Sequence, residues 1–68
     1  MINWVNVTSS AIKKIGYDTS SNRMYIDFND SDPYYTFCRV PEKVFQRGIN
    51  ASSVGQYYHA YIKDKYDC

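Results

Sequence analysis

The sequence predicts a small α+β domain, in which a three-stranded antiparallel β-meander is followed by two short helices packed on one face. Three observations lead to this prediction. Residues 23–28 alternate between apolar and polar side chains, which is the pattern of a half-buried strand. Short runs of turn-forming residues lie on both sides of this segment. After Pro41, apolar residues recur at the three- and four-residue spacing of helices.

The first strand is expected over residues 11–17, although its alternation is imperfect. Residues 18–22 are turn formers and predict a hairpin to the second strand. In that second strand, residues 23–28, successive side chains point to opposite faces of the sheet. One face carries Met24, Ile26 and Phe28, and the other carries Arg23, Tyr25 and Asp27.

A third strand is expected over residues 34–40, after the turn formers at residues 29–33. Its alternation places Tyr35 and Phe37 on one face, and Tyr34, Thr36, Cys38 and Val40 on the other. Whether Tyr35 and Phe37 share a face with Tyr25 depends on the register between the two strands. Local sequence does not determine that register, so both arrangements stay open.

The first helix is expected to begin after Pro41, because proline suits a first helical turn, where its missing N–H is not needed. It should end between residues 47 and 49, with Val44 and Phe45 turned inward. Gly48 is expected to weaken or cap its last turn.

The second helix is expected from a capping box, Ser53 to Gln56, to about Tyr66. Helical spacing gathers one stripe of side chains on it: Val54, Tyr58, Tyr61, Ile62 and Lys65. Tyr57 lies at the edge of this stripe.

Size and charge favour binding over catalysis. A chain of 68 residues makes one domain, residues 1–68, and is short for building both a core and a deep active site. The net charge of +1 argues against bulk electrostatic attachment to nucleic acid or anionic lipid. Eight tyrosines help so small a domain bury enough apolar area.

The N-terminal residues lack the basic start and apolar run of an export signal, and no segment is long enough to span a bilayer. We therefore expect a cytoplasmic protein without a membrane partner. Cys38 and Cys68 are expected to be reduced in that compartment, with a single bridge between them as the alternative.

As a whole, the pattern resembles the KTSC family over about residues 5–66. The resemblance rests on an ordered series of short matches: Val7-Thr8-Ser9-Ser10, Ile15-Gly16-Tyr17-Asp18, Tyr35-Thr36-Phe37, Val40-Pro41, Val44-Phe45, Ala51, Ser53, Gly55 and Tyr57-Tyr58. There are two departures from the family pattern. Gly48 stands where a large aliphatic residue is usual, and Phe37 lacks the hydroxyl of the usual tyrosine.

The KTSC family comprises short stand-alone bacterial and phage proteins and the C-terminal domain of some lysyl-tRNA synthetases. The resemblance therefore implies a bacterial or phage origin. It implies little about function, because the family has no established activity and RNA binding has been suggested for it.

No catalytic or metal site is expected, and no cofactor. His59 is the only histidine, and nothing in the spacing places a nucleophile beside it. Asp27, Asp30 and Asp32 alternate along a strand end and a turn, but they lack the glycine and the bidentate glutamate of a calcium loop. We interpret them as a solvated turn, and the protein as a non-enzyme.

Single-stranded RNA or DNA binding is one hypothesis. Proteins hold unpaired bases on aromatic side chains, with Lys or Arg near the phosphates. The candidate platform is a sheet face bearing Tyr17, Tyr25, Tyr35 and Phe37, with Lys13, Arg23 and Arg39 around it. The competing interpretation of each of these aromatic residues is that it fills the core.

Protein binding is the favoured hypothesis, because tyrosine and arginine are enriched at interface hot spots. The candidate patch lies along the second helix and comprises Tyr57, Tyr61 and Tyr66, with Lys63 and Lys65 nearby. We expect a protein-interaction or regulatory module whose partner is a host protein or a second copy of the chain. The competing interpretation buries these rings against the sheet.

Overall fold

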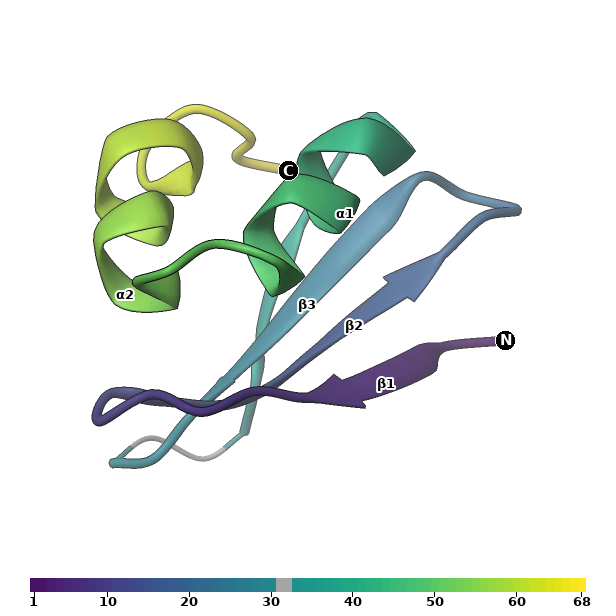
Figure 1. The fold of residues 1–68 in the computed structure, drawn as a ribbon. Helices are drawn as coiled ribbons and strands as arrows, with labels where there is room; N and C mark the ends of the chain where they lie inside the picture. Colours follow the sequence, from purple (N-terminus) through teal and green to yellow (C-terminus); the bar gives the residue numbers. More distant parts are fainter. Residues whose placement is uncertain (31–32) are drawn as a thin grey trace.

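The structure, a computed structural model, describes residues 1–30 and 33–68. Four antiparallel strands form one sheet in chain order: β1 (Asn3–Asn6), β2 (Ile12–Asp18), β3 (Arg23–Phe28) and β4 (Tyr35–Phe37). Three helical elements follow: α1 (Glu42–Ile49), α2 (Val54–Tyr57) and a π-helical turn η1 (Tyr58–Ile62). The helices lie on one side of the sheet (Figure 1), which confirms the predicted α+β class and meander.

The sheet has four strands, so the predicted count of three is wrong. Trp4 and Val5 lie between two asparagines and give no alternation long enough to indicate a strand. Residues 3–6 form a strand because they pair with β2, where Trp4 lies opposite Gly16 and Val5 opposite Ile15. This strand therefore depends on its neighbour rather than on its own sequence.

Gly16 of β2 leaves room for side chains from β1 and the residues before it. A Cβ atom at this position would come within 2.6 Å of the side chain of Ile2 and 2.9 Å of the ring of Trp4. Real Cβ atoms do not approach other atoms so closely, so the glycine leaves the room that the Trp4 indole occupies.

A β-bulge explains the imperfect alternation of β2. Ile12 pairs with Phe28 and Lys14 pairs with Asp27, so Lys13 is an extra residue without a partner on β3. Because of this extra residue, Ile15 and Tyr17 lie on the same face of the sheet as Ile12, which is the face toward the helices.

The register between β3 and β4 settles the question that the sequence left open. Phe37 lies opposite Met24, and Tyr35 lies opposite Ile26. Directly opposite residues share a face, so Tyr35 and Phe37 face the helices. Tyr25 lies opposite Thr36 on the other face, which we call the open face.

β4 is shorter than the predicted strand over residues 34–40. The backbone of Arg39 adopts a positive φ of 55°, which breaks the extended conformation. The N–H of Cys38 donates to the carbonyl of Tyr66 at 2.9 Å, and the N–H of Val40 donates to that of Asn22 at 2.8 Å. The end of the predicted strand thus bonds to two other segments rather than to β3.

The core lies between the sheet and the helices. It is formed by Ile12, Ile15, Tyr17, Met24, Ile26, Phe37, Val40, Phe45, Val54 and Ile62. Tyr17 connects the sheet to α1, because its ring stacks on that of Phe45 with centroids 5.1 Å apart. Its hydroxyl donates to the carbonyl of Val40, just before that helix. Burial raises the pKa of this phenol, and the carboxylates of Glu42 and Asp18 add to the effect.

The second helical segment begins as predicted and ends earlier. Ser53 caps it by accepting a hydrogen bond from the N–H of Gln56 at 3.4 Å. At η1 the N–H of Lys63 donates to the carbonyl of Tyr58, five residues back. This wide turn shifts the helical phase. Tyr61, which helical spacing grouped with Val54 and Ile62, is 58% exposed, while Tyr57, predicted at the edge of that stripe, is half-buried.

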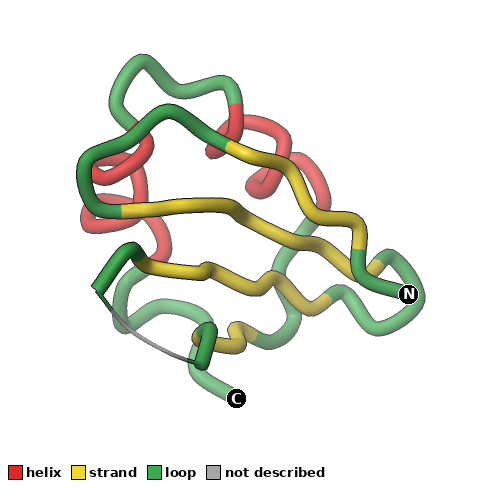
Figure 2. The backbone as a smooth tube through the Cα atoms, turned by 90° about the horizontal axis from the view of Figure 1, so that it is seen from below, coloured by secondary structure: helices red, strands yellow, loops and turns green. Residues whose placement is uncertain are grey.

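Cys38 and Cys68 form a disulfide, with their Cα atoms 4.9 Å apart. The prediction that both are reduced is therefore wrong. The C-terminal segment runs back beside β4 (Figure 2), where Cys38 also bonds to the backbone of Tyr66. Disulfides are typical of oxidising compartments, and the cytoplasmic location stays a prediction. None of the helices that the structure describes is long and apolar enough to cross a bilayer.

Candidate functional site

The four aromatic residues proposed as a nucleic-acid platform do not form one surface. Tyr17 and Phe37 are buried on the helix side, at 2% and 6% exposure. Tyr35 is on the same side but half exposed, and Tyr25 is on the open face but buried, at 8% exposure. Arg39 is exposed in the turn between β4 and α1. The strand register therefore places the four aromatic residues of the predicted platform on two different faces of the sheet.

The open face carries a different aromatic cluster, which we call the open-face cluster. Tyr25 lies at its centre, with ring centroids 6.2 Å from Trp4 and 5.4 Å from Tyr34. Trp4 and Tyr34 also contact each other, at 5.3 Å. The ammonium of Lys14 lies 4.7 Å from the centre of the Trp4 ring. The sequence did not reveal this cluster, because Trp4 belongs to the strand that was not predicted.

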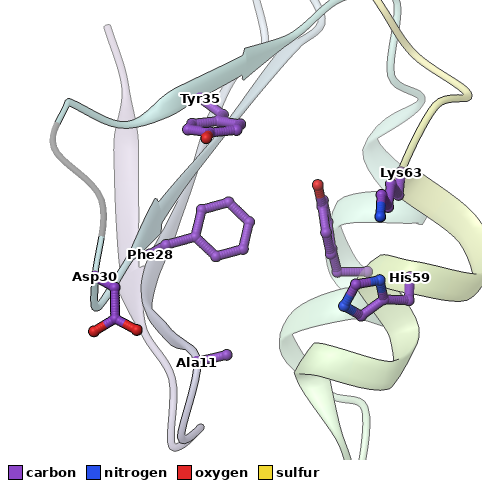
Figure 3. Close-up of a pocket in the computed structure, with 7 residues that line it drawn as sticks. Ala11, Phe28, Asp30, Tyr35, His59 and Lys63 are labelled. Carbon is purple, nitrogen blue, oxygen red and sulfur yellow. The ribbon is translucent and has the colours of Figure 1, made fainter.

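A first cavity, of about 320 Å³, lies between the edge of the sheet and η1 (Figure 3). Its lining residues are Ala11, Phe28, Asp30, Tyr35, Tyr58, His59 and Lys63. The ring of Phe28 lies edge-on to Tyr35 and to Tyr58, at 5.2 Å from each. The cavity brings together Tyr35 and Lys63, which the sequence had assigned to two different surfaces.

The charges around this cavity are of both signs. Asp30 lies on the sheet side, and Lys63 and His59 lie on the helical side (Figure 3). Burial raises the pKa of Tyr58, and the carboxylates of Asp64 and Asp67 raise it further. The rim therefore does not select a ligand of one charge.

A second and larger cavity, of about 570 Å³, lies between α1, the helical turns and the C-terminal segment. We call it the tyrosine groove. Its lining residues are Val44, Arg47, Ala51, Ser52, Tyr57, Tyr61, Lys65 and Tyr66. It brings together all three tyrosines of the patch predicted along the second helix, together with Lys65. The sequence did not indicate Arg47, which comes from the last turn of α1.

Tyr57 and Tyr61 form the wall of the groove on the helical side. Their ring centroids lie 4.8 Å apart. The hydroxyl of Tyr57 donates to the carbonyl of Val44 at 3.0 Å, which fixes this ring against α1. Burial raises the pKa of Tyr57, while the nearby guanidinium of Arg47 acts in the opposite direction. Tyr61 rests on the fixed ring and is more than half exposed.

Tyr66 closes the groove on the side of the C-terminal segment. Its ring packs against the core, and its carbonyl accepts the hydrogen bond from Cys38. The Cys38–Cys68 disulfide holds the same segment two residues further on. This wall of the groove therefore depends on a covalent link that the sequence analysis had not favoured.

The described residues include no group of three or more His, Cys, Asp or Glu side chains placed to hold a metal ion. Asp27 is on the open face of β3, and Asp30 lines the first cavity. Asp32, the third member of the weak cation motif, lies outside the described residues. His59 is exposed, with its ring 5.2 Å from that of Tyr58.

The fold and these surfaces define a small α+β domain with a four-stranded antiparallel meander and its helices on one face. The chain belongs to the KTSC domain family, whose model matches residues 8–66. This confirms the resemblance drawn from the sequence. The structure is similar to the crystal structure of a KTSC domain protein from Yersinia pestis. The TM-score is 0.90 and the identity is 32%, over 97% of this chain and 92% of the other.

Two curated relatives are lysine–tRNA ligases. The chain is 37% identical to that of Trichormus variabilis and 35% identical to that of Nostoc punctiforme, in both cases over 57 residues and 84% of the chain. The matched region makes up only 10% of the length of each relative.

Proposed function

We propose that this KTSC domain is a non-enzymatic protein-interaction module that docks a partner protein in the tyrosine groove. One observation carries the proposal: exposed Tyr61 rests on Tyr57, which is itself fixed by its hydrogen bond to Val44. Tyrosine and arginine are enriched at interface hot spots, and the groove combines three tyrosines with Arg47. Its volume is within the range of known ligand sites, about 300–1,000 Å³.

Pre-organisation of the groove also supports docking. A side chain that is already held in place loses little entropy when a partner binds, so more of the contact energy appears as affinity. Tyr57 is held by α1, and Tyr66 is held by the disulfide-linked segment. We propose a host or bacterial protein as the partner, with a regulatory outcome. A second copy of the chain is the alternative occupant.

The test compares Tyr61→Ala with Tyr34→Ala. Both tyrosines are exposed, at 58% and 42%, but only Tyr61 lines the groove. Tagged wild-type protein is used to capture partners from a bacterial lysate, and the affinity of a purified partner is then measured directly. We expect Tyr61→Ala to weaken binding at least tenfold and Tyr34→Ala to leave it unchanged. Equal effects of the two variants, or no captured partner, would contradict the proposal.

Self-association has its own readout. Sedimentation of the wild-type protein at rising concentration separates a monomer from a dimer. A dimer that Tyr61→Ala dissociates identifies the second copy as the occupant. A concentration-independent monomer excludes it.

Single-stranded nucleic acid is the second candidate, and the open-face cluster is the observation that favours it. Stacking on an aromatic side chain contributes about 1–3 kcal/mol per base. Trp4 and Tyr34 lie together over the buried ring of Tyr25, with Lys14 beside Trp4. In this test Tyr34→Ala is the disruptive variant and Tyr61→Ala is the control. Tyr34→Ala and Lys14→Gln should weaken binding to a labelled single-stranded RNA, and Tyr61→Ala should not. No binding at low salt would exclude this candidate.

A further inference from the structure

We propose that the tyrosine groove takes an extended acidic peptide segment of the partner, whose carboxylates lie between Arg47 and Lys65 and whose apolar side chain lies on Tyr61. This inference rests on the proposed function and adds the chemistry of the occupant. The lining of the groove is positively charged, although the net charge of the whole chain is only +1.

The cations reach the groove from two separate segments. Arg47 comes from the last turn of α1, and Lys65 comes from the C-terminal segment after η1. Both side chains are exposed. Among the described residues that line the groove, none is acidic. A carboxylate placed there meets two positive charges and no competing negative one.

Two acidic residues lie near Lys65 in the sequence, but neither lines the groove. They are Asp64 and Asp67, which lie one and two residues from Lys65. Asp64 has a positive φ of 63°, so the backbone turns directly before Lys65. The groove is therefore more positive than the sequence of the segment suggests.

The polar groups of the groove suit a peptide. The hydroxyl of Tyr57 is already used by the carbonyl of Val44. The more exposed phenol of Tyr61 remains placed to donate to a peptide carbonyl or a carboxylate. Its ring offers an apolar surface of the kind that a leucine or an aromatic side chain covers. Arg47 adds a guanidinium whose planar donors match a carboxylate in pairs.

Nucleic acid fits this groove less well. A phosphate backbone carries one charge per nucleotide, and its binding scales with the number of cations that neutralise it. The groove supplies only Arg47 and Lys65, and the whole chain has a net charge of +1. A short carboxylate-bearing segment matches two cations better than a polyanion does.

The experiment uses three labelled peptides that differ only in charge, and fluorescence anisotropy as the readout. Each contains a Leu-Tyr pair flanked by two glutamates, by two glutamines or by two lysines. We expect the glutamate peptide to bind about five- to tenfold more tightly than the glutamine peptide at low salt, and the lysine peptide to bind weakest. The difference should shrink as salt is added.

Charge reversal locates the effect. The double variant Arg47→Glu and Lys65→Glu should reverse the order and prefer the lysine peptide. Lys43→Glu is the matched control, because Lys43 is exposed on α1 but does not line the groove. It should preserve the original order. Thermal unfolding of each variant shows that the fold is intact, and Arg47→Gln with Lys65→Gln serves if the double reversal does not fold.

The outcomes separate this inference from the proposed function. Equal affinity for the glutamate and glutamine peptides, both lost in Tyr61→Ala, would overturn the charge preference and leave the docking groove standing. No binding of the glutamate peptide at any salt concentration would also overturn the inference. Insensitivity of the captured partner to Tyr61→Ala would contradict the proposed function itself. Tighter binding of a single-stranded RNA that depends on Lys65 would replace the peptide with nucleic acid.

Discussion

The ring of Tyr57 lies directly against Gly48, so that a Cβ atom on this glycine would come within 3.2 Å of the ring. This contact joins α1 to α2 at Tyr57, which lines the tyrosine groove. Gly48 stands where the KTSC pattern usually has a large aliphatic residue, and in this chain the Tyr57 ring takes up the space. The absence of a side chain at Gly48 is thus matched by the ring of Tyr57.

Substitution Gly48→Leu should displace Tyr57 and lower stability by about 1–3 kcal/mol, the usual effect of overpacking a filled site. Urea unfolding measures the change, and groove binding should weaken in parallel. Gly55→Ala is the control, because a Cβ there meets only Ser9 Oγ at 3.9 Å. It should be neutral or slightly stabilising, as alanine favours helix. A fully stable Gly48→Leu would show that Tyr57 does not need this space.

Reduction of the Cys38–Cys68 bridge should lower stability by roughly 3–4 kcal/mol, the chain-entropy effect of opening a loop of about thirty residues. It should also loosen the wall that Tyr66 forms and weaken groove binding. Urea unfolding with and without a dithiol reductant measures the first effect. The double variant Cys38→Ser and Cys68→Ser is the control and should not respond to the reductant. A wild-type midpoint that is unchanged by reductant would contradict the prediction.

Stability should decline at alkaline pH because of the buried phenol of Tyr17. Folding raises the pKa of Tyr17, chiefly through burial, so its contribution is complete below the ordinary tyrosine pKa of about 10. It is lost as pH rises through the higher pKa of the folded state. Unfolding free energies measured from neutral pH to above pH ~10 test this.

Tyr17→Phe isolates this residue. It removes the buried hydrogen bond to Val40 and should lower stability by about 1–2 kcal/mol at neutral pH. The alkaline decline of the variant should be shallower than that of the wild type. Tyr57→Phe is the comparison, because its bond to Val44 is only part-buried and its loss should matter less. An unchanged alkaline slope in Tyr17→Phe would assign the decline to other groups.

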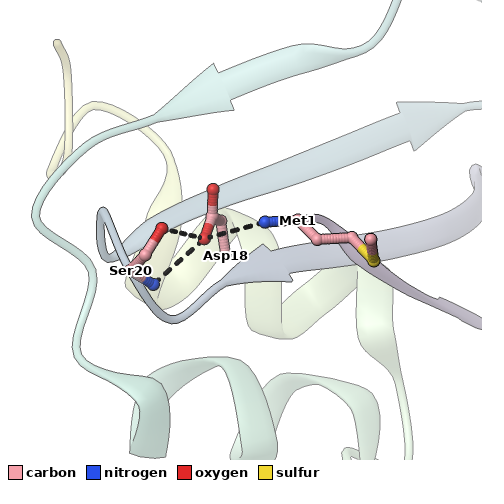
Figure 4. Close-up of polar contacts among 3 residues, drawn as sticks. All are labelled: Met1, Asp18 and Ser20. Atoms are coloured by element: carbon pink, nitrogen blue, oxygen red, sulfur yellow. Dashed lines mark hydrogen bonds and ion pairs between the residues drawn. The ribbon is translucent and has the colours of Figure 1, made fainter.

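Asp18 should titrate below its ordinary range. The side-chain hydroxyl and the backbone N–H of Ser20 both donate to it, and the N-terminal ammonium of Met1 lies 3.6 Å away (Figure 4). Hydrogen bonding from Ser20 lowers the pKa of this carboxyl. The contribution of ionised Asp18 to the free energy of unfolding is therefore complete above the ordinary aspartate pKa. It is lost as pH falls through the lower pKa that Asp18 has in the folded state.

NMR titration of the Asp18 carboxyl tests this directly. Ser20→Ala should move the midpoint back toward the ordinary value, because both the hydroxyl bond and the turn geometry are affected. Asp18→Asn should remove the acid-dependent part of the stability. A midpoint that Ser20→Ala leaves unchanged would mean that the N-terminal ammonium is the main cause.

Some features of the fold and the site could be predicted because their cause is local. The alternation of β3 reports which side chains face the core, and turn formers mark where the chain reverses. The Ser53 cap is a four-residue pattern. The same helical spacing gathered Tyr57 and Tyr61 on the second helix, and they line one groove.

Other features depend on partners far away in the chain. β1 exists because Gly16 makes room for Trp4 on the neighbouring strand, and no pattern within residues 3–6 indicates this. Arg47 joins the groove from α1, which local spacing on the second helix does not report. The phase of that helix changes at η1, so a constant period grouped exposed Tyr61 with buried Val54 and Ile62.

The sequence by itself determined the α+β class, the antiparallel meander, where each of the two helical segments begins and the family. These follow from periodicity, turn chemistry and an ordered series of short matches, all of which are written along the chain. Tertiary structure alone decided that Tyr25 and Tyr35 lie on opposite faces and that Cys38 is bonded to Cys68. The physical reason is that strand register and the path of the C-terminal segment depend on contacts between distant residues, and local sequence carries no record of them.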